Sequence, residues 1–284
     1  MAEPPTTGLA HREAEVARRW GLRLGSRLAG GHRSHVRDCV TAGGTSVVLK
    51  LTRTIDEAGL EARALAGWQE TGAAVRLLAA DAEHGALLLE RLRPGTPLSA
   101  GDAPAVLDAV ELLDRLHSVP VPAGFPSVAD CFPERARIAL ADNRAERADH
   151  REPDRAAGAL ALMGDAQRAV TVLGSSATRE VLLHGDFLDK NLLLHAAGYR
   201  AVDPMPYRGE PECEIGFFES HHPPVAGTLH RAATIARRLG ADPDRAGRWA
   251  AVWTVVLAVS AWRADQPDLD ALVASRPFTE ILKA

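Results

Sequence analysis

The chain has 284 residues, a length that suits two domains better than one minimal domain. Hydrophobic residues make up 46% of it and charged residues 25%, proportions that are typical of a soluble globular protein and exclude a disordered chain. With 33 Lys and Arg against 37 Asp and Glu, the net charge is −4. This balance argues against nucleic-acid binding through a clustered positive surface and against docking of a basic helix on a membrane.

The cysteines and the apolar segments of the sequence argue against a disulfide-linked, a secreted and a membrane-spanning protein. Cys39, Cys131 and Cys213 are odd in number and far apart, so they predict neither a disulfide framework nor a CxxC metal site. The N-terminal residues contain no apolar stretch typical of a secretion signal, which favours a cytoplasmic protein. The most apolar run, residues 249–262, is shorter than the roughly 20 residues that span a bilayer, and it predicts a buried helix.

A small β-rich region is predicted for residues 22–92. Gly43 and Gly44 separate two β-rich runs, a pattern typical of a hairpin. Residues 56–70 have helical spacing, and Gly72 is a suitable helix stop. Because two more short apolar runs follow within the region, we expect a small twisted sheet that carries one helix.

The rest of the chain is mainly helical in its pattern. Residues 93–97, with two prolines and a glycine, predict a turn or linker. Helical spacing of apolar or charged residues then recurs at 104–117, 134–149, 155–173 and beyond 227. Short strands interrupt the helices within residues 181–202. The sequence therefore predicts an α+β fold with a β-rich lobe, a hinge and an α-rich lobe.

A His-Gly-Asp tripeptide at residues 184–186 begins the segment with the sharpest chemical signal. Asn191 follows Asp186 after four intervening residues, and Asp203 comes directly after a further predicted strand. Phosphoryl transfer from ATP needs a carboxylate that accepts the proton of the attacking hydroxyl, and an amide oxygen and a second carboxylate that hold Mg²⁺. Asp186 is thus predicted as the catalytic base, and Asn191 and Asp203 as the metal ligands. A lone tripeptide of this kind is more often a surface turn, but the spacing of the other two groups disfavours that interpretation.

These motifs resemble a known family. His-Gly-Asp, the asparagine and the following Val-Asp-Pro look like the aminoglycoside phosphotransferase family of small-molecule kinases, distant relatives of protein kinases. Within it, the chain is similar to the streptomycin 6-phosphotransferase and hydroxyurea phosphotransferase group, on four segments: 72–78, 88–92, 116–120 and 202–211. Two features depart from the usual pattern. Phe187 stands where a leucine is common, and the pair Asp189-Lys190 stands where a small or basic pair is usual; neither removes a required group.

The resemblance implies a protein-kinase-like two-lobed fold, with a nucleotide-binding lobe at residues 1–92 and a catalytic and substrate-binding lobe at 93–284. It implies ATP and Mg²⁺ as cofactors. Lys50 ends a strand-like run that is similar to the kinase strand whose lysine contacts the α- and β-phosphates. That lysine needs a carboxylate from the next helix, and both Glu61 and Glu57 lie on a suitable helical face.

The remaining nucleotide contacts are also implied by the resemblance. It assigns Gly30, Gly31 and Ser34 to the phosphates, Glu90, Arg91 and Leu92 to the hinge beside the adenine, and Val48, Leu193 and Val202 to the apolar walls around the ring. A plain β-turn is the alternative for the glycine stretch, and ordinary core packing is the alternative for the apolar residues.

Acidic residues after Asp203 are the candidates for acceptor binding. A cationic aminoglycoside needs carboxylates around its ammonium or guanidinium groups. Besides Asp186, the candidate substrate-binding residues are Glu210, Glu212, Glu214 and Glu219. The alternative is an exposed acidic loop. His221 and His222 are adjacent and lack further ligands at metal-binding spacing, so they predict a loop rather than a metal site.

The sequence thus favours an ATP- and Mg²⁺-dependent O-phosphotransferase that acts on a hydroxyl of a small, cationic molecule. An aminoglycoside of the streptomycin type, inactivated as an antibiotic, is the leading acceptor, and hydroxyurea or a small metabolite is the alternative. A nucleotide-binding module without activity is disfavoured, because the Lys, Asp, Asn and Asp set is complete. A protein kinase is disfavoured because the GxGxxG, DFG and APE signatures are absent.

Overall fold

The structure is a computed structural model that describes residues 6–28, 34–99, 103–142, 153–196, 198–222, 227–260 and 276–283. The chain folds into two units. One comprises Met1–Val119 and Asp189–Pro206, and the other comprises Pro120–Leu188 and Tyr207–Ala284. The chain therefore passes from one unit to the other three times. The division at residue 92 into a nucleotide-binding and a catalytic lobe is a functional one, and it stays a prediction.

A five-stranded antiparallel sheet is the main β structure of the first unit, with strand order β1-β2-β3-β5-β4. Its strands are β1 (Arg23–Arg27), β2 (His35–Val40), β3 (Ser46–Leu51), β4 (Leu77–Asp81) and β5 (Ala86–Glu90). The predicted hairpin joins β2 to β3, and Gly44 in its turn has a φ of 82°, which glycine adopts without strain. Because side chains alternate along a strand, β3 directs Leu49 to one face of the sheet and Lys50 to the other.

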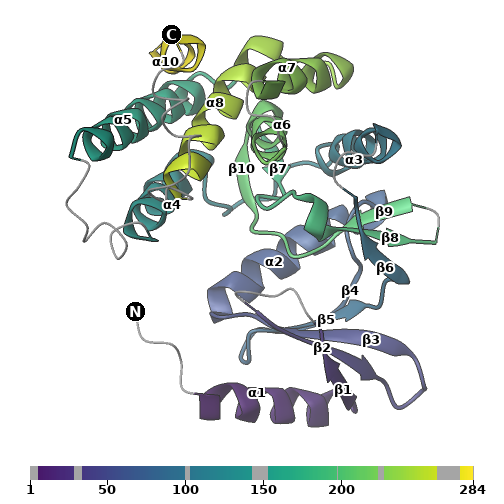
Figure 1. Ribbon diagram of the computed structural model, residues 1–284. Coiled ribbons are helices and arrows are strands. Elements are labelled where there is room, and N and C mark those ends of the chain that lie inside the picture. The colour runs from purple at the N-terminus through teal and green to yellow at the C-terminus, as the bar shows by residue number, and fades with distance from the viewer. Residues whose placement is uncertain are drawn as a thin grey trace. The chain divides into compact units, whose positions relative to one another are not determined.

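The helix α1 (Thr6–Arg19), which the sequence did not lead us to expect, covers the Leu49 face of the sheet (Figure 1). Val16 is fully buried there, and Leu9 and Trp20 pack against the same apolar cluster. Leu9 and Val16 are seven positions apart and lie on one face of the helix. Trp20, four positions after Val16, continues that face just past the C-terminal end of the helix. The sheet is thus covered on the side opposite to Lys50.

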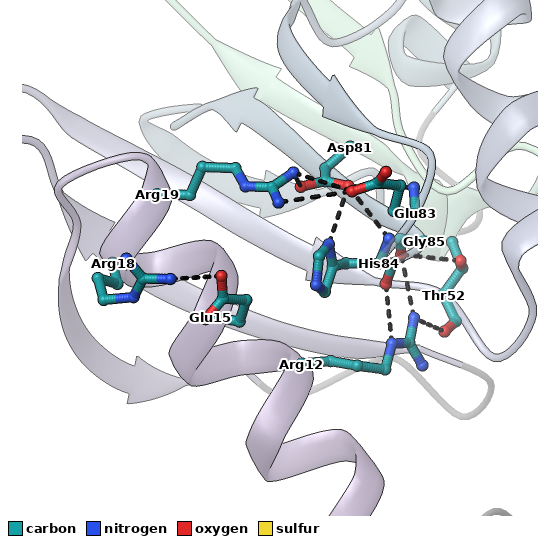
Figure 2. Close-up of polar contacts among 9 residues, drawn as sticks. All are labelled: Arg12, Glu15, Arg18, Arg19, Thr52, Asp81, Glu83, His84 and Gly85. Carbon is teal, nitrogen blue, oxygen red and sulfur yellow. Dashed lines mark hydrogen bonds and ion pairs between the residues drawn. The ribbon is translucent and has the colours of Figure 1, made fainter.

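Polar contacts fasten α1 to the loop between β4 and β5 (Figure 2). Arg12 Nε donates to the carbonyl oxygen of His84 at 2.8 Å. Its Nη2 donates to the carbonyl oxygens of Thr52 at 3.0 Å and Gly85 at 3.3 Å. One guanidinium therefore joins the helix to three carbonyls that follow two different strands, and its fork of donors suits this arrangement.

The helix α2 (Ile55–Trp68) lies on the other side of the sheet (Figure 1). It begins with a capping box, in which the Thr54 hydroxyl accepts from Glu57 N and the Glu57 side chain accepts from Thr54 N. A short 3₁₀ turn, η1 (Gln69–Thr71), extends it to Gly72, whose φ of 61° ends the helix. The predicted helix and its glycine stop are confirmed.

The rest of the first unit is built from a smaller sheet and one helix. The sheet has the order β6-β8-β9, with β6 (Pro94–Pro97), β8 (Leu192–His195) and β9 (Gly198–Ala201). The 3₁₀ turn η2 (Asp189–Asn191) leads into β8, and α3 (Ala103–Leu116) packs on β9. Trp68 Nε1 donates to the carbonyl oxygen of Leu116 at 3.0 Å and thereby ties the end of α2 to the end of α3.

The second unit is helical around the long helix α8 (Pro243–Ser260), which packs against five other helices. These are α4 (Val128–Asp142), α5 (Pro153–Ser175), α6 (Pro211–Ser220), α7 (Thr228–Arg238) and α10 (Arg276–Lys283). Two short strands, β7 (Val181–Leu183) and β10 (Tyr207–Gly209), pair antiparallel beside them. Within α8 the rings of Trp249 and Trp253 stack 6.4 Å apart, so the predicted buried helix is confirmed. No helix in the part of the chain that the structure describes is long and apolar enough to cross a membrane.

The helix α6 occupies residues for which the sequence suggested an acidic loop. Every one of its ten residues is buried, including the glutamates Glu212, Glu214 and Glu219. Pro211 stands at its start, where a proline costs no hydrogen bond. Gly216 lets α6 approach α8 closely, because a Cβ there would lie 2.5 Å from Ala250 N. This close contact places the acidic residues of α6 inside the second unit.

Candidate active site

Lys50 lies at the centre of a charged group in the first unit. Its Nζ donates to both carboxylate oxygens of Glu61, at 2.7 and 2.6 Å, and to Asp203 Oδ1 at 2.5 Å. Of the two carboxylates that the sequence left open, Glu61 is therefore the partner of Lys50, and Glu57 caps its own helix. Strand β3, helix α2 and the segment after β9 each supply one member of the group.

The two carboxylates stabilise the charge of Lys50, whereas burial outweighs Lys50 at Glu61 and raises the pKa of that carboxyl. Burial by itself disfavours the ammonium form of Lys50, but the carboxylates of Glu61 and Asp203 outweigh it and hold the pKa of Lys50 above its ordinary value of 10.5. Lys50 and Glu61 are buried, whereas the side chain of Asp203 is 41% exposed. A buried, charged lysine is thus held in place, with one carboxylate beside it still open to solvent.

The β8–β9 hairpin brings Asn191 to the same end as Asp203. Leu192 pairs with Ala201 in the sheet, and Val202 N donates to the carbonyl oxygen of Asn191 at 2.9 Å. Asn191 is therefore opposite the residue that precedes Asp203. Asp203 has a φ of 58°, in the left-handed region that aspartate tolerates better than most residues, and this conformation ends the strand. The two predicted metal ligands, an amide and a carboxylate, are thus neighbours.

The predicted hinge residues use their side chains within the chain. Glu90 Oε1 accepts from Arg76 N at 2.8 Å and pairs with Arg200, while Arg91 Nε lies 3.1 Å from Asp38 Oδ1. The side chains of Glu90 and Arg91 thus have partners within the chain, and a contact of this segment with a base stays a prediction. Leu92 is buried.

The other predicted nucleotide contacts have mixed positions. Val48 is buried on β3, two residues before Lys50. Leu193 and Val202 are half-buried at the β8–β9 hairpin. Ser34 is half-buried just before β2. Gly30 and Gly31 lie outside the described residues, so their role stays a prediction.

Asp186 belongs to the second unit and follows β7. Gly185 before it has a φ of 78°, which a residue with a side chain rarely adopts. The carboxylate of Glu214 accepts from His184 N at 3.0 Å and from Gly185 N at 2.7 Å. Arg135 Nη2 donates to the carbonyl oxygen of Gly185 at 2.9 Å. The main chain leading into Asp186 is therefore held by two charged side chains from α6 and α4.

The four glutamates proposed for acceptor binding are buried and have partners in the second unit. Glu210 pairs with Arg245 and accepts from Trp249, and Glu219 pairs with Arg231. The remaining two accept from main-chain N–H groups, with Asp242 N donating to Glu212 at 2.8 Å. Contacts within the chain thus explain all four. Their substrate-binding role stays a prediction without structural support.

Two features of the site were not found from the sequence. Arg135 carried no motif, since its partner, the Gly185 carbonyl, is fifty residues away along the chain. The anchoring role of Glu214 was obscured because its acidic surroundings suggested a ligand-binding loop. One signal could have indicated both residues. The main-chain groups of a His-Gly-Asp turn with a left-handed glycine need hydrogen-bond partners from elsewhere in the chain.

A third group, Asp81, Glu83 and His84, has ligand atoms close enough for one metal ion. Asp81 Oδ1 already accepts from the main-chain N–H groups of Glu83 and His84, and Asp81 Oδ2 accepts from Arg19 Nη1 at 2.7 Å (Figure 2). Because Arg19 of α1 already pairs with the carboxylates of Asp81 and Glu83, the group is better explained as an anchor for α1.

Comparison with known proteins decides the family. The family model "Aminoglycoside/hydroxyurea antibiotic resistance kinase" matches residues 19–266. The chain belongs to this family. A hydroxyurea phosphotransferase of Kitasatospora aureofaciens is 35% identical over 264 residues, which are 85% of this chain and 70% of that protein. A streptomycin 6-kinase of Streptomyces griseus is 31% identical over 214 residues, which are 73% of this chain and 66% of that protein.

The fold of the family extends to more distant kinases. The solved structure of an amicoumacin kinase in complex with AMP-PNP, Ca²⁺ and Ami has a TM-score of 0.60 to this chain, at 13% identity, and the match covers 98% of this chain and 96% of that one. The predicted α+β, protein-kinase-like fold is therefore confirmed, as is the predicted resemblance. The chain is a small-molecule kinase, that is, a phosphotransferase of an antibiotic-resistance family.

Proposed function

We propose that the protein transfers the γ-phosphoryl group of ATP, in the presence of Mg²⁺, to a hydroxyl group of a small molecule. The observation that carries this proposal is the group formed by Lys50, Glu61 and Asp203, with Asn191 beside it. A buried ammonium held by one carboxylate is suited to bind phosphate oxygens, since its position is set before the ligand arrives. The expected place of action is the cytoplasm, where ATP is available.

The residues at this end of the β8–β9 hairpin fit a magnesium ion. Asn191 and Asp203 offer amide and carboxylate oxygens, the hard donors that Mg²⁺ prefers. The 41% exposure of the Asp203 side chain leaves it accessible to such an ion. When bound, Mg²⁺ would neutralise charge on the phosphates during transfer. Lys50 would then share Asp203 with the metal and remain held by Glu61.

Asp186 is the proposed base. Its carboxylate would orient the acceptor hydroxyl and take its proton as the oxygen attacks phosphorus, so that an alkoxide never has to form free in water. This role requires a fixed direction of the side chain, and the hydrogen bonds from His184 N and Gly185 N to Glu214, which hold the main chain before Asp186, support it.

For the acceptor we propose an aminoglycoside of the streptomycin type, inactivated by phosphorylation. The 31% identity to a streptomycin 6-kinase supports this choice. The charge argument from the sequence no longer adds to it, because the glutamates of α6 pair within the chain. Hydroxyurea is the second candidate, and it is favoured by the 35% identity to a hydroxyurea phosphotransferase.

The test is release of ADP by the purified protein with Mg²⁺ and ATP, measured across streptomycin, other aminoglycosides, hydroxyurea and simple metabolite alcohols. We expect acceptor-dependent ADP release with one class of acceptor and a phosphorylated product of matching mass. Asp186→Asn is expected to lower turnover by at least about 10³-fold and to leave nucleotide binding largely intact, because it removes the base and no phosphate contact. An active Asp186→Asn protein, or binding of ATP with no turnover on any acceptor, would refute the proposal.

A further inference from the structure

We propose that Arg135 is a positioning residue for the reaction: it fixes the peptide group between Gly185 and Asp186 and so sets the direction of the Asp186 carboxylate. This inference rests on the proposed function, in which Asp186 is the base. Arg135 is half-buried on α4, in the same unit as Asp186, and no motif of the sequence includes it.

The contact of Arg135 acts on one particular peptide plane. Its Nη2 donates to the Gly185 carbonyl oxygen at 2.9 Å, and that carbonyl shares a rigid peptide group with the nitrogen of Asp186. The two preceding peptide groups, with the nitrogens of His184 and Gly185, donate to Glu214. Three consecutive peptide planes are therefore held, the first two by Glu214. The last is held by Arg135 at its carbonyl oxygen, while its nitrogen, that of Asp186, donates to His184 Nδ1 over a longer distance of 3.4 Å.

Such fixing has a physical purpose at this place. Gly185 has a φ of 78° and no side chain that packs, so its own conformational preferences are weak. Without Arg135, the last peptide plane would keep only the long contact from Asp186 N to His184 Nδ1 at 3.4 Å, and it could rotate and carry the Cα–Cβ bond of Asp186 with it. A hydrogen bond from a charged donor is roughly twice as strong as a neutral one and suits this task.

The guanidinium is itself held by aromatic rings. Its Cζ lies 5.2 Å from the centroid of the Tyr207 ring, 5.5 Å from that of Trp253 and 5.9 Å from that of Phe217. These rings come from β10, α8 and α6, and all three are buried. Ring faces attract cations within about 6 Å. Since a planar guanidinium can lie against the rings and still donate at its edge, the arrangement suits arginine better than lysine.

The same helix offers a matched control. Arg137 is two residues further along α4, its side chain is 63% exposed, and it pairs with Glu134 at 2.6 Å. Loss of its charge changes the helix composition in the same way as loss of Arg135, but an exposed pair between neighbours on one helix contributes little. Comparison of Arg135→Met with Arg137→Met thus separates the contacts that Arg135 makes with Gly185 and the rings from the loss of one positive charge on α4.

We expect Arg135→Met to lower kcat by about 10- to 100-fold, since a misplacement of roughly 1 Å at a reacting group can cost about 10²-fold. The KM for ATP should stay within about threefold, because Lys50, Asn191 and Asp203 belong to the other unit. Arg135→Lys keeps a cation that can donate to the carbonyl, so its kcat should lie between those of the wild type and Arg135→Met. Arg137→Met should have the wild-type kcat.

The experiment compares the wild type, Asp186→Asn, Arg135→Met, Arg135→Lys and Arg137→Met in steady-state ADP release, with the best acceptor of the panel. Binding of a fluorescent ATP analogue and the melting temperature are measured on the same samples, so that loss of folded protein is separated from loss of kcat. A wild-type kcat in Arg135→Met, an equal loss in Arg137→Met, or a loss that follows the folded fraction would overturn the positioning role. If Arg135→Met does not fold, Arg135→Lys decides, since a wild-type kcat there with a lowered melting temperature means a purely structural residue. Activity of Asp186→Asn would instead overturn the proposed function.

Discussion

Replacement of Glu214 by glutamine tests how the segment from His184 to Asp186, which carries the proposed base, is held. The carboxylate accepts from His184 N and Gly185 N, one hydrogen bond on each oxygen, and it is only 1% exposed. Glutamine has a single acceptor oxygen, so its NH₂ group would face one of the two N–H donors. One charge-assisted hydrogen bond is then lost and a buried N–H is left unsatisfied, a cost of about 2–3 kcal/mol. We expect Glu214→Gln to lower both the stability and kcat.

The matched control is Glu212→Gln, two residues earlier on α6. Glu212 accepts from Asp242 N through Oε1, and the glutamine oxygen can keep that hydrogen bond. We therefore expect a loss of less than about 1 kcal/mol from this change. The assay is urea unfolding followed by tryptophan fluorescence, combined with kcat and the KM for the acceptor.

The reasoning is refuted if Glu214→Gln and Glu212→Gln are equally stable. It is also refuted if Glu214→Gln raises the KM for the acceptor and leaves stability and kcat unchanged, because that result supports the substrate-binding role predicted from the sequence. A positioning role requires the opposite pattern, in which kcat falls and the KM for the acceptor stays close to the wild-type value.

Two further predictions concern each unit separately. In the second unit, Gly216→Ala should destabilise the protein by about 1–3 kcal/mol, since the new Cβ would lie 2.5 Å from the α8 backbone. Gly247→Ala should stabilise it by about 0.5–1 kcal/mol, because a Cβ there meets nothing within 4 Å. Equal melting temperatures of the two variants would contradict this prediction. In the first unit, burial alone would raise the pKa of Asp81, but the hydrogen bonds from His84 and the charge of Arg19 outweigh it and leave that pKa below its ordinary 3.8. The stability that Asp81 contributes is therefore complete above about pH 3.8 and lost as the pH falls further. The difference in unfolding free energy between the wild type and Asp81→Asn should shrink from pH 6 to pH 3, and a constant difference would disprove the assignment.

The sequence allowed good predictions where a local pattern or a motif carries the structure. The β2–β3 hairpin and α2 follow from turn and capping residues next to them in the chain. The contact between Lys50 and Asp203 joins residues 153 positions apart, and no local pattern contains it. The kinase-like motifs assigned Lys50 to the phosphates and Asp203 to the metal, and they did not predict this direct contact.

The helices α1 and α6 were missed for opposite physical reasons. The apolar stripe of α1 is sparse, because one face of a single sheet needs only Leu9, Val16 and the adjacent Trp20. By contrast, α6 is buried on all sides and has no polar face, so its residues have no helical period in polarity. Its glutamates suggested a solvated loop because their partners, such as Arg245 and Arg231, are supplied by later helices.

The path of the chain through its two units also bears on how the protein is made. The first unit includes Asp189–Pro206, so β8, which pairs with β6, and Asp203 after it are synthesised only after the whole first segment of the second unit, Pro120–Leu188. Until then Lys50 has Glu61 but lacks its second carboxylate. The N-terminal unit is incomplete until these strands have been synthesised, and the group of Lys50, Glu61 and Asp203 is completed only by contacts of high sequence separation, which form slowly. Its appearance during synthesis would therefore mark the point at which both units have begun to fold.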